Sequence, residues 1–150
     1  MEHRQHHSSS PSSPTARVTD TPSYGEITSH GAKTVLYLTW ARLDAFQRQD
    51  ELSDAYLSIG GELGAIVVPV GVAWQRVLKT HPEVTLRDRD QSHPNPAGSY
   101  LAACVFFATL FDRGPLGLPT DAIGSKPIDS ERCKLLQEAA WHMVQAFNGR

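Results

Sequence analysis

Cysteine is scarce in this chain, and neither sign of charge dominates it. The 150 residues include two cysteines, Cys104 and Cys133, and carry a net charge of −2 at neutral pH. Two cysteines at no metal-ligand spacing exclude a disulfide framework and a cysteine-based zinc module. Both fall in apolar helical patterns, where a free cysteine acts as a small hydrophobe. The weak net charge gives no support for a nucleic-acid partner.

Long apolar runs are also missing. No stretch approaches the ~20 apolar residues of a membrane-spanning helix, and the N-terminus has no apolar core of a secretory signal. The default expectation is therefore a cytoplasmic chain without a membrane span. No motif indicates a cofactor or a bound metal. With 40% apolar and 20% charged residues, the composition suits one globular domain.

Large apolar side chains are rare before residue 32. This segment holds a serine- and proline-rich run over 8–14 and three histidines, His3, His6 and His7. It cannot bury enough surface to offset the entropy of ordering it. Residues 1–31 are therefore expected to form a disordered tail. Loose binding of a transition metal by the three histidines is the less favoured alternative to a solvated tail.

The remainder, 32–150, has the pattern of an α/β domain. Its apolar β-branched runs predict two parallel strands buried on both faces, and helical spacing predicts a helix between them, so the order is a βαβ unit. Asn95 and Ser130 are the expected caps of the last two helices. The predicted elements are strand 34–40, helix 50–63, strand 65–70, helix 72–78, helix 96–111 and helix 130–147.

Two strands are few for a parallel sheet that is buried on both faces. The core is therefore expected to be incomplete, or to be completed by another chain through the open edge of the sheet.

A polar loop over 79–95 holds the main candidate site. It follows the second strand and should lie near the carboxyl ends of the strands, where open α/β sheets place their sites. Asp90 and His93 stand three residues apart in it. An aspartate that orients a histidine, and a histidine that moves a proton, are two of the three parts of a nucleophilic hydrolase site. A capped surface loop without chemistry is the alternative.

Several other side chains have both a chemical and a structural interpretation. A zinc site built from His81, Asp88, Asp90 and His93 has suitable ligand types but no familiar spacing. Aromatic, charged and thiol groups complete the set, and for each of them packing or solvation is favoured over a role in the site: Trp40, Trp74, Tyr100, Arg42, Asp44 and Cys104.

The segment Asp90-Gln91-Ser92-His93, followed by Pro94-Asn95-Pro96-Ala97-Gly98 and a Tyr-Leu-Ala-Ala helix, resembles the last conserved block of the SGNH (GDSL-type) hydrolase family. Segments 39–42 and 68–74 also resemble its later strands, so the likeness covers about residues 32–112. The resemblance implies a partial flavodoxin-like three-layer α/β/α fold and hydrolysis of small acyl esters, lipids or acylated sugars. It also implies that His93 is the general base and Asp90 its orienting carboxylate.

Three blocks of that family have no counterpart here: the serine turn, the second-block glycine and the Gly-x-Asn-Asp asparagine. Ser29 lacks a preceding strand, and Ser92 lies inside the Asp/His turn itself. The chain is therefore expected to be the C-terminal part of such a hydrolase, and to be inactive or nearly so alone. The alternative is a non-catalytic α/β module that binds a partner or small ligand through its exposed sheet edge.

Overall fold

A computed structural model describes residue 19, residues 22–119 and residues 128–149. The chain forms two compact units, Met1–Ala32 and Lys33–Arg150. In the first unit, helix α1 spans Pro22–Ser29 and has no buried residue. This part of the segment that was expected to be disordered is therefore helical. The prediction for residues 1–18 and 20–21, including the three early histidines, lies outside the described residues.

The sheet of the second unit has two parallel strands among the described residues. β1, Val35–Tyr37, pairs with β2, Ile66–Val68, so that Leu36 lies opposite Val67. Between them the chain forms a 3-10 helix, η2 (Leu43–Arg48), and helix α2 (Gln49–Leu63). Gly64 ends α2 in the left-handed conformation, with φ 59°, which glycine adopts at little cost.

Both strands are shorter than the predicted 34–40 and 65–70, because a helix takes over the hydrogen bonds of the ladder. Helix α3 spans Val70–Thr80 and begins directly after β2. The amide of Gly71, in its first turn, donates to the carbonyl of Leu38 at 2.8 Å. That carbonyl is the next acceptor along β1, so the ladder ends there. The helix predicted over 72–78 therefore begins two residues earlier.

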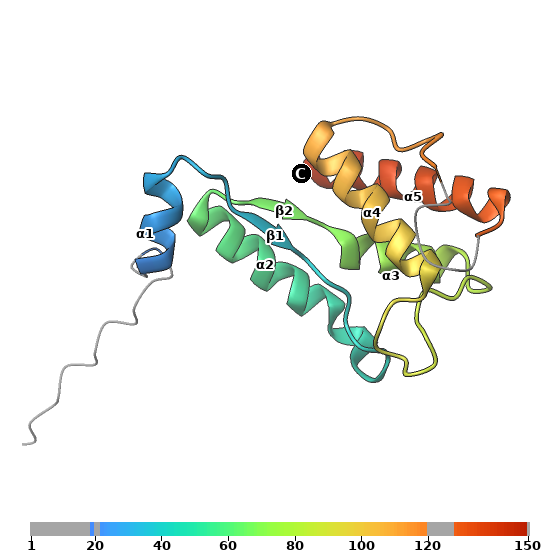
Figure 1. The fold of residues 1–150 in the computed structure, drawn as a ribbon. Helices are drawn as coiled ribbons and strands as arrows, with labels where there is room; N and C mark the ends of the chain where they lie inside the picture. Colours follow the sequence, from blue (N-terminus) through green and yellow to red (C-terminus); the bar gives the residue numbers. More distant parts are fainter. Residues whose placement is uncertain (1–18, 20–21, 120–127, 150) are drawn as a thin grey trace, which may run out of the picture. The chain divides into compact units, whose positions relative to one another are not determined.

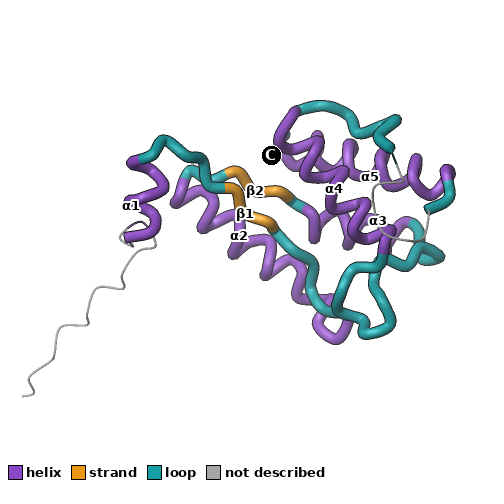
Figure 2. Tube along the Cα trace, viewed as in Figure 1, coloured by secondary structure: helices purple, strands orange, loops and turns teal. Residues whose placement is uncertain are grey.

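Helices cover both faces of the sheet (Figures 1 and 2). On one face, Gly60 of α2 lies against the side chains of Val67 and Leu36, with no room for a Cβ. On the other, Phe106 of helix α4 (Pro96–Phe111) packs edge-on against Tyr37, with ring centroids 5.0 Å apart. The result is a three-layer α/β/α arrangement on two strands, which confirms the predicted partial α/β fold class.

The main core lies between the sheet and the three later helices. Helix α5 (Ser130–Asn148) packs along α4, and both contact α3. Fully buried members of this core include Val68, Val70, Trp74, Val77, Leu101, Val105, Leu136 and Val144. Within the described ranges, no helix is long and apolar enough to cross a membrane.

The caps of the last two helices differ in one respect from the prediction. Asn95 caps α4 as expected, because its side-chain oxygen accepts from the amide of Gly98 at 2.9 Å. The cap of α5 is Asp129, whose carboxylate accepts from the amide of Arg132 at 2.8 Å. The prediction of Ser130 was therefore wrong by one residue. A carboxylate next to the positive end of the helix dipole is the better-placed acceptor here.

The burial of β1 also differs from the prediction. Continuous apolar sequence indicated a strand covered on both faces, but Val35 is 39% and Tyr37 is 40% exposed. The reason is that no further strand among the described residues pairs with the outer edge of β1. The outer edge of β1 is therefore open to solvent.

Candidate active site

The segment from Leu86 to Asn95 is a closed turn, and backbone hydrogen bonds hold its two ends together. Arg87 and Pro94 form an antiparallel bridge, and the amide of Asn95 donates to the carbonyl of Leu86 at 2.9 Å. Nearer the tip, the amide of Asp88 donates to the carbonyl of His93 at 2.8 Å. This backbone network fixes the separation between the residues at the tip. We call residues 86–95 the Asp–His turn.

Asp90 and His93 come together within the Asp–His turn. One carboxylate oxygen of Asp90, Oδ1, accepts from the amides of Ser92 at 3.0 Å and His93 at 2.9 Å. The other oxygen, Oδ2, is hydrogen-bonded to Nδ1 of the His93 ring. Because an ionised carboxylate can only accept, Nδ1 carries the proton of this bond. The side chain of His93 is 79% exposed, so its Nε2 edge is open to a reacting group.

The contacts of the pair shift both pKa values toward the charged forms. The hydrogen bond from His93, followed by the two backbone amides, lowers the pKa of Asp90 to about 2. The hydrogen bond to Asp90 and the charge of that carboxylate raise the pKa of His93 above its ordinary 6.5. The carboxylate is therefore ionised throughout the physiological range, and the imidazolium is stabilised relative to a free histidine.

Two hydrogen bonds attach the Asp–His turn to the segment that leaves β1. The indole Nε1 of Trp40 donates to the carbonyl of Ser92 at 3.0 Å, and Nη2 of Arg87 donates to the carbonyl of Ala41 at 2.9 Å. Trp40 and Ala41 follow the last residue of β1 by three and four positions. The Asp–His turn thus lies at the carboxyl end of β1, as predicted from the sequence.

The tryptophans near the turn pack against each other. Trp40 and Trp74 are stacked, with ring centroids 3.9 Å apart and an interplanar angle of 4°. The guanidinium of Arg87 lies 5.4 Å from the centre of the Trp74 ring. Trp74 is 1% exposed. This geometry agrees with the packing role that was favoured over a place in a substrate pocket.

Gln49 holds the segment that leaves β1 through two hydrogen bonds, and it was not predicted from the sequence. It is buried, and its Oε1 accepts from the amide of Ala41 at 2.7 Å while its Nε2 donates to the carbonyl of Thr39 at 3.2 Å. It therefore satisfies the hydrogen-bonding groups of the backbone where the chain turns away from β1. A glutamine between Arg48 and Asp50 gives no sign of burial in the sequence, so no pattern singled it out.

A hollow of about 330 Å³ borders the Asp–His turn. Arg42 and Asp44, candidates for substrate contact, form an exposed ion pair at 3.4 Å beside it. The hollow is lined by Arg42, Leu43, Asp44, Asp90 and Gln91. Arg42 and Asp44 thus lie next to Asp90, although their own contact is a solvated one.

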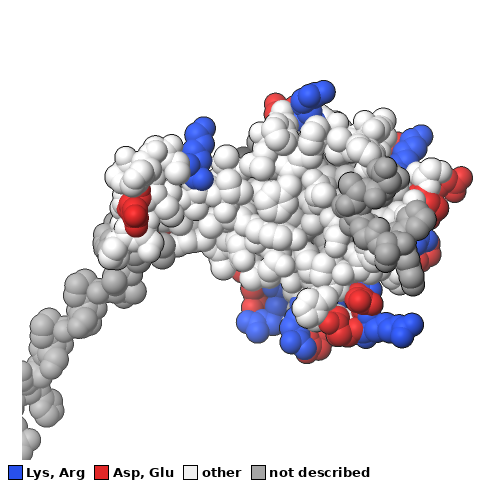
Figure 3. Space-filling view, in the orientation of Figure 1, with Lys and Arg blue, Asp and Glu red and all other residues white. Residues whose placement is uncertain are grey.

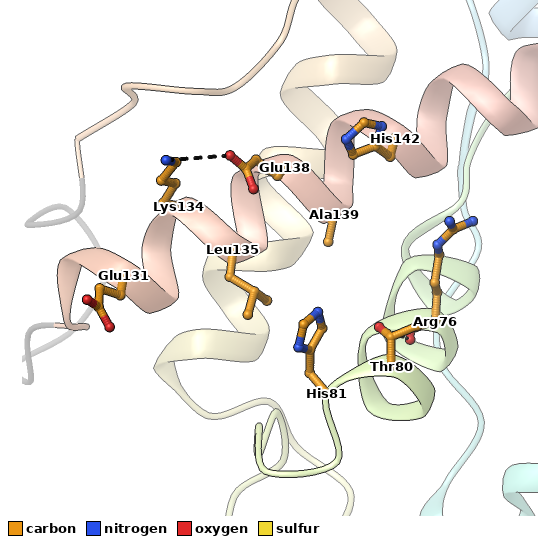
Figure 4. Close-up of a pocket in the computed structure, with 9 residues that line it drawn as sticks. All are labelled: Arg76, Thr80, His81, Glu131, Lys134, Leu135, Glu138, Ala139 and His142. Carbon is orange, nitrogen blue, oxygen red and sulfur yellow. Dashed lines mark hydrogen bonds and ion pairs between the residues drawn. The ribbon is translucent and has the colours of Figure 1, made fainter.

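Of the four side chains of the zinc alternative, only those of Asp90 and His93 contact each other. His81 lies in another hollow, of about 490 Å³, between the end of α3 and α5, where it points toward Leu135 (Figure 4). Its Nδ1 is 3.5 Å from a carboxylate oxygen of Glu83. Asp88 accepts from the amide of Arg89 at 2.8 Å. Within the described part of the chain, no three histidine, cysteine or acidic side chains are placed to hold a metal ion.

Among the described residues, no nucleophilic side chain is hydrogen-bonded to His93. Its ring is hydrogen-bonded to Asp90 and to no serine or threonine hydroxyl there. Burial raises the pKa of the Cys104 thiol to about 12, so this group stays protonated and unreactive. Tyr100 is a core residue, and its hydroxyl donates to the carbonyl of Leu118 at 3.2 Å. Ser29 belongs to α1 and donates to the carbonyl of Glu26 at 2.8 Å.

The chain is similar to one solved structure of a DUF4886 family protein from Bacteroides uniformis ATCC 8492. The two share 24% identity with a TM-score of 0.61, and the match covers 76% of this chain and 48% of that one. This chain therefore spans about half the length of the similar structure, and the likeness shows a shared fold over the matched part. No family model and no curated protein matches the chain.

Proposed function

We propose that this chain supplies the aspartate and histidine of a serine-dependent acyl-hydrolase site like that of the SGNH hydrolases. The observation that carries the proposal is the His93 ring, held at Nδ1 by Asp90 and open at Nε2. The position of the Asp–His turn beyond the carboxyl end of β1 also supports it, because open α/β sheets build their sites there.

In the proposed reaction, Nε2 of His93 takes the proton of an attacking hydroxyl, which forms a bond to the acyl carbon. The protonated ring then returns this proton to the leaving alcohol, and water repeats the cycle to release the acid. Asp90 holds the ring proton on Nδ1, so that Nε2 has a free lone pair and can act as the base. Asp90 also stabilises the imidazolium that forms. The proposed substrates are small acyl esters, including acylated sugars.

The hydroxyl and the oxyanion donors of such a site are not among the groups that contact His93. Each oxyanion donor contributes about 10²–10³-fold in rate. The chain alone is therefore proposed to turn over activated esters slowly, through the base function of His93, and to fall far below a complete hydrolase. An activated aryl ester suits the test because its leaving group needs little help.

The test is hydrolysis of 4-nitrophenyl acetate by the purified chain, by His93→Ala and by His142→Ala. His142 is an exposed histidine of α5 beside the other hollow, so its variant controls for non-specific imidazole catalysis. We expect His93→Ala to remove most of the rate above buffer and His142→Ala to leave it nearly unchanged. Because the base must be neutral, the rate should rise with pH through a midpoint above 6.5.

Two outcomes would contradict the proposal. Equal loss in both histidine variants would show that His93 has no special role. Stoichiometric labelling of the chain by a fluorophosphonate probe would show that a complete serine site is present, and the proposal of a half-site would be wrong.

The open edge of β1 favours a second candidate function, a non-catalytic α/β module that binds through this edge. Val35 and Tyr37 are exposed there, and no described strand pairs with them. A chain whose ester hydrolysis is indifferent to His93 but which associates through β1 would be such a module.

A further inference from the structure

The outer edge of β1 presents backbone groups that no described strand uses. In a parallel ladder, alternate residues of a strand bond to the same neighbour. Leu38 donates to Val68, and Ile66 donates to Thr34, so the even-numbered residues of β1 face β2. The N–H and C=O groups of Val35 and Tyr37 therefore point to the other side, where the described sheet has no strand.

The residues of this edge lack the charges, prolines and bulges that protect other edge strands. Natural edge strands carry charges, prolines or bulges that discourage a second strand. Between Thr34 and Trp40 the chain has no charged residue and no proline. The strand is also regular in its pairing with β2. An edge of this composition is suited to accept another strand.

The side chains beside this edge form an apolar strip across β1 and α4. Val35, Tyr37 and Leu110 are 39%, 40% and 45% exposed. Phe106 joins them, because its partly buried ring packs against Tyr37 and it lies one turn before Leu110. We call these four residues the β1 strip. Figure 3 shows the face over β1 and α4 largely free of charge, with charged side chains gathered over η2 and the Asp–His turn.

We infer that a second copy of this chain docks on the β1 strip, with the two β1 strands antiparallel about a two-fold axis at Leu36. In this register Val35 of each copy faces Tyr37 of the other. Both residues direct their backbone groups outward, so the two pairs form four hydrogen bonds. The two-stranded sheets join into one four-stranded sheet, and the same apolar patch is covered on both copies.

A second copy fits this edge for three reasons. The two outward-facing residues are placed symmetrically about Leu36, so the edge is complementary to itself. The β1 strip is uncharged, so two copies meet without repulsion between like charges. Four strands also fall within the commonest size of sheet, about four to six strands, whereas this sheet has two among the described residues.

The mass of the full chain in solution tests the dimer. We expect light scattering after gel filtration, over a series of concentrations, to give twice the 16.5 kDa of one chain. Tyr37→Lys places a charge in the β1 strip and should halve this mass. Val35→Lys is a second variant with the same expected result. Leu116→Lys, at a residue 61% exposed outside the β1 strip, is the matched control and should remain dimeric.

A cross-link tests the register. At the two-fold axis, Leu36 forms a non-hydrogen-bonded antiparallel pair with its own copy, with Cα atoms about 4.5 Å apart, within reach of a disulfide. Leu36→Cys should therefore form a covalent dimer on mild oxidation. Val35→Cys should not, because two copies of residue 35 are offset along the strands. The native Cys104 and Cys133 are buried, so the unsubstituted chain is the blank.

A monomeric mass for the unsubstituted chain at every concentration overturns the inference, and so does a dimer that Tyr37→Lys and Val35→Lys leave intact while circular dichroism shows both folded. A monomer that gains mass only with an added protein would assign the edge to a different partner. These measurements do not depend on His93, so their failure is distinct from failure of the proposed function.

Discussion

The two carboxylate oxygens of Asp90 have different roles. Oδ1 closes the turn by accepting two backbone amides, while Oδ2 holds the ring of His93. The geometry of the turn and the basicity of the histidine therefore depend on one side chain. Because the pair lies in solvent, its contribution to the free energy of folding is small.

Replacing Asp90 by asparagine tests the effect on His93. Asp90→Asn removes the charge that favours the imidazolium, so the pKa of His93 should fall back toward 6.5. A pH titration of the ring signals by nuclear magnetic resonance measures it. Glu83→Gln, which removes the carboxylate beside His81, is the control and should leave His93 unchanged. An unaltered pKa in Asp90→Asn would show that the pair is not coupled in solution.

The sign of the pH dependence follows from the direction of each shift. The pKa of Asp90 is lowered in the folded chain, so its stabilising effect is full above 3.8 and is lost as the pH falls toward 2. The pKa of His93 is raised, so its effect is full below 6.5 and is lost as the pH rises through the new value. The pair stabilises the turn most between these limits.

The sequence predicted the central pair of the site but not its supports. Asp90 and His93 stand at a spacing that a single turn brings together, and this is a local property. Gln49 accepts from the amide of Ala41 across 8 positions, and Arg87 donates to the carbonyl of Ala41 across 46 positions. Contacts of this kind depend on the folded path of the chain, which residue spacing does not reveal.

At the scale of elements, α4 sets the position of the Asp–His turn by close packing. Gly98 in its first turn lies against the carbonyl oxygen of Leu86 and the ring of Trp74. An added Cβ would come within 2.6 Å of one carbon of that ring. The absence of a side chain at Gly98 thus lets the helix, the indole stack and the base of the turn meet.

Gly98→Ala should therefore destabilise the fold by about 1–3 kcal/mol, which is typical of overpacking in a core. Gly61→Ala in α2 is the matched control, because a Cβ there meets no atom within 4 Å. It should be neutral or stabilise by up to about 1 kcal/mol, since alanine favours a helix over glycine. Denaturant unfolding measures both. Equal stability of the two variants would contradict this account of the packing.

Helices were predicted more closely than strands, for a local reason. The bounds of α4 follow from Asn95 and Pro96 at its start, and those of α5 from an apolar face ahead of Asn148 and Gly149. The ends of β1 and β2 depend instead on how α3 takes the carbonyl of Leu38. Helix α1 was missed because it has no buried face that apolar spacing would reveal.

At the scale of the whole molecule, the chain builds three layers on a narrow sheet. The predicted class rested on the βαβ order, which is encoded locally by two apolar runs and the helix between them. The open edge of the sheet was expected from the small number of strands, but the exposure of Val35 and Tyr37 was not, because a continuous apolar run does not show which strands flank it. Which neighbours a strand has is a property of the assembly.

Deleting residues 1–32 should leave the stability of the second unit nearly unchanged. The two units are compact separately, and α1 has no buried residue. We expect the free energy of unfolding to change by no more than about 0.5 kcal/mol, as for surface changes in general. Denaturant unfolding of the full chain and of residues 33–150 measures it, and a larger loss would show that the first unit supports the core.

Two of the three tryptophans of the chain stand in one parallel stack next to the proposed site. Indoles held this close share their electronic excitation, so their near-ultraviolet circular dichroism depends on the angle between the rings. The indole of Trp40 also donates a hydrogen bond to the carbonyl of Ser92. A shift of that peptide therefore rotates the ring of Trp40 relative to the ring of Trp74. The near-ultraviolet circular dichroism of the unlabelled protein should therefore report movement of the Asp–His turn.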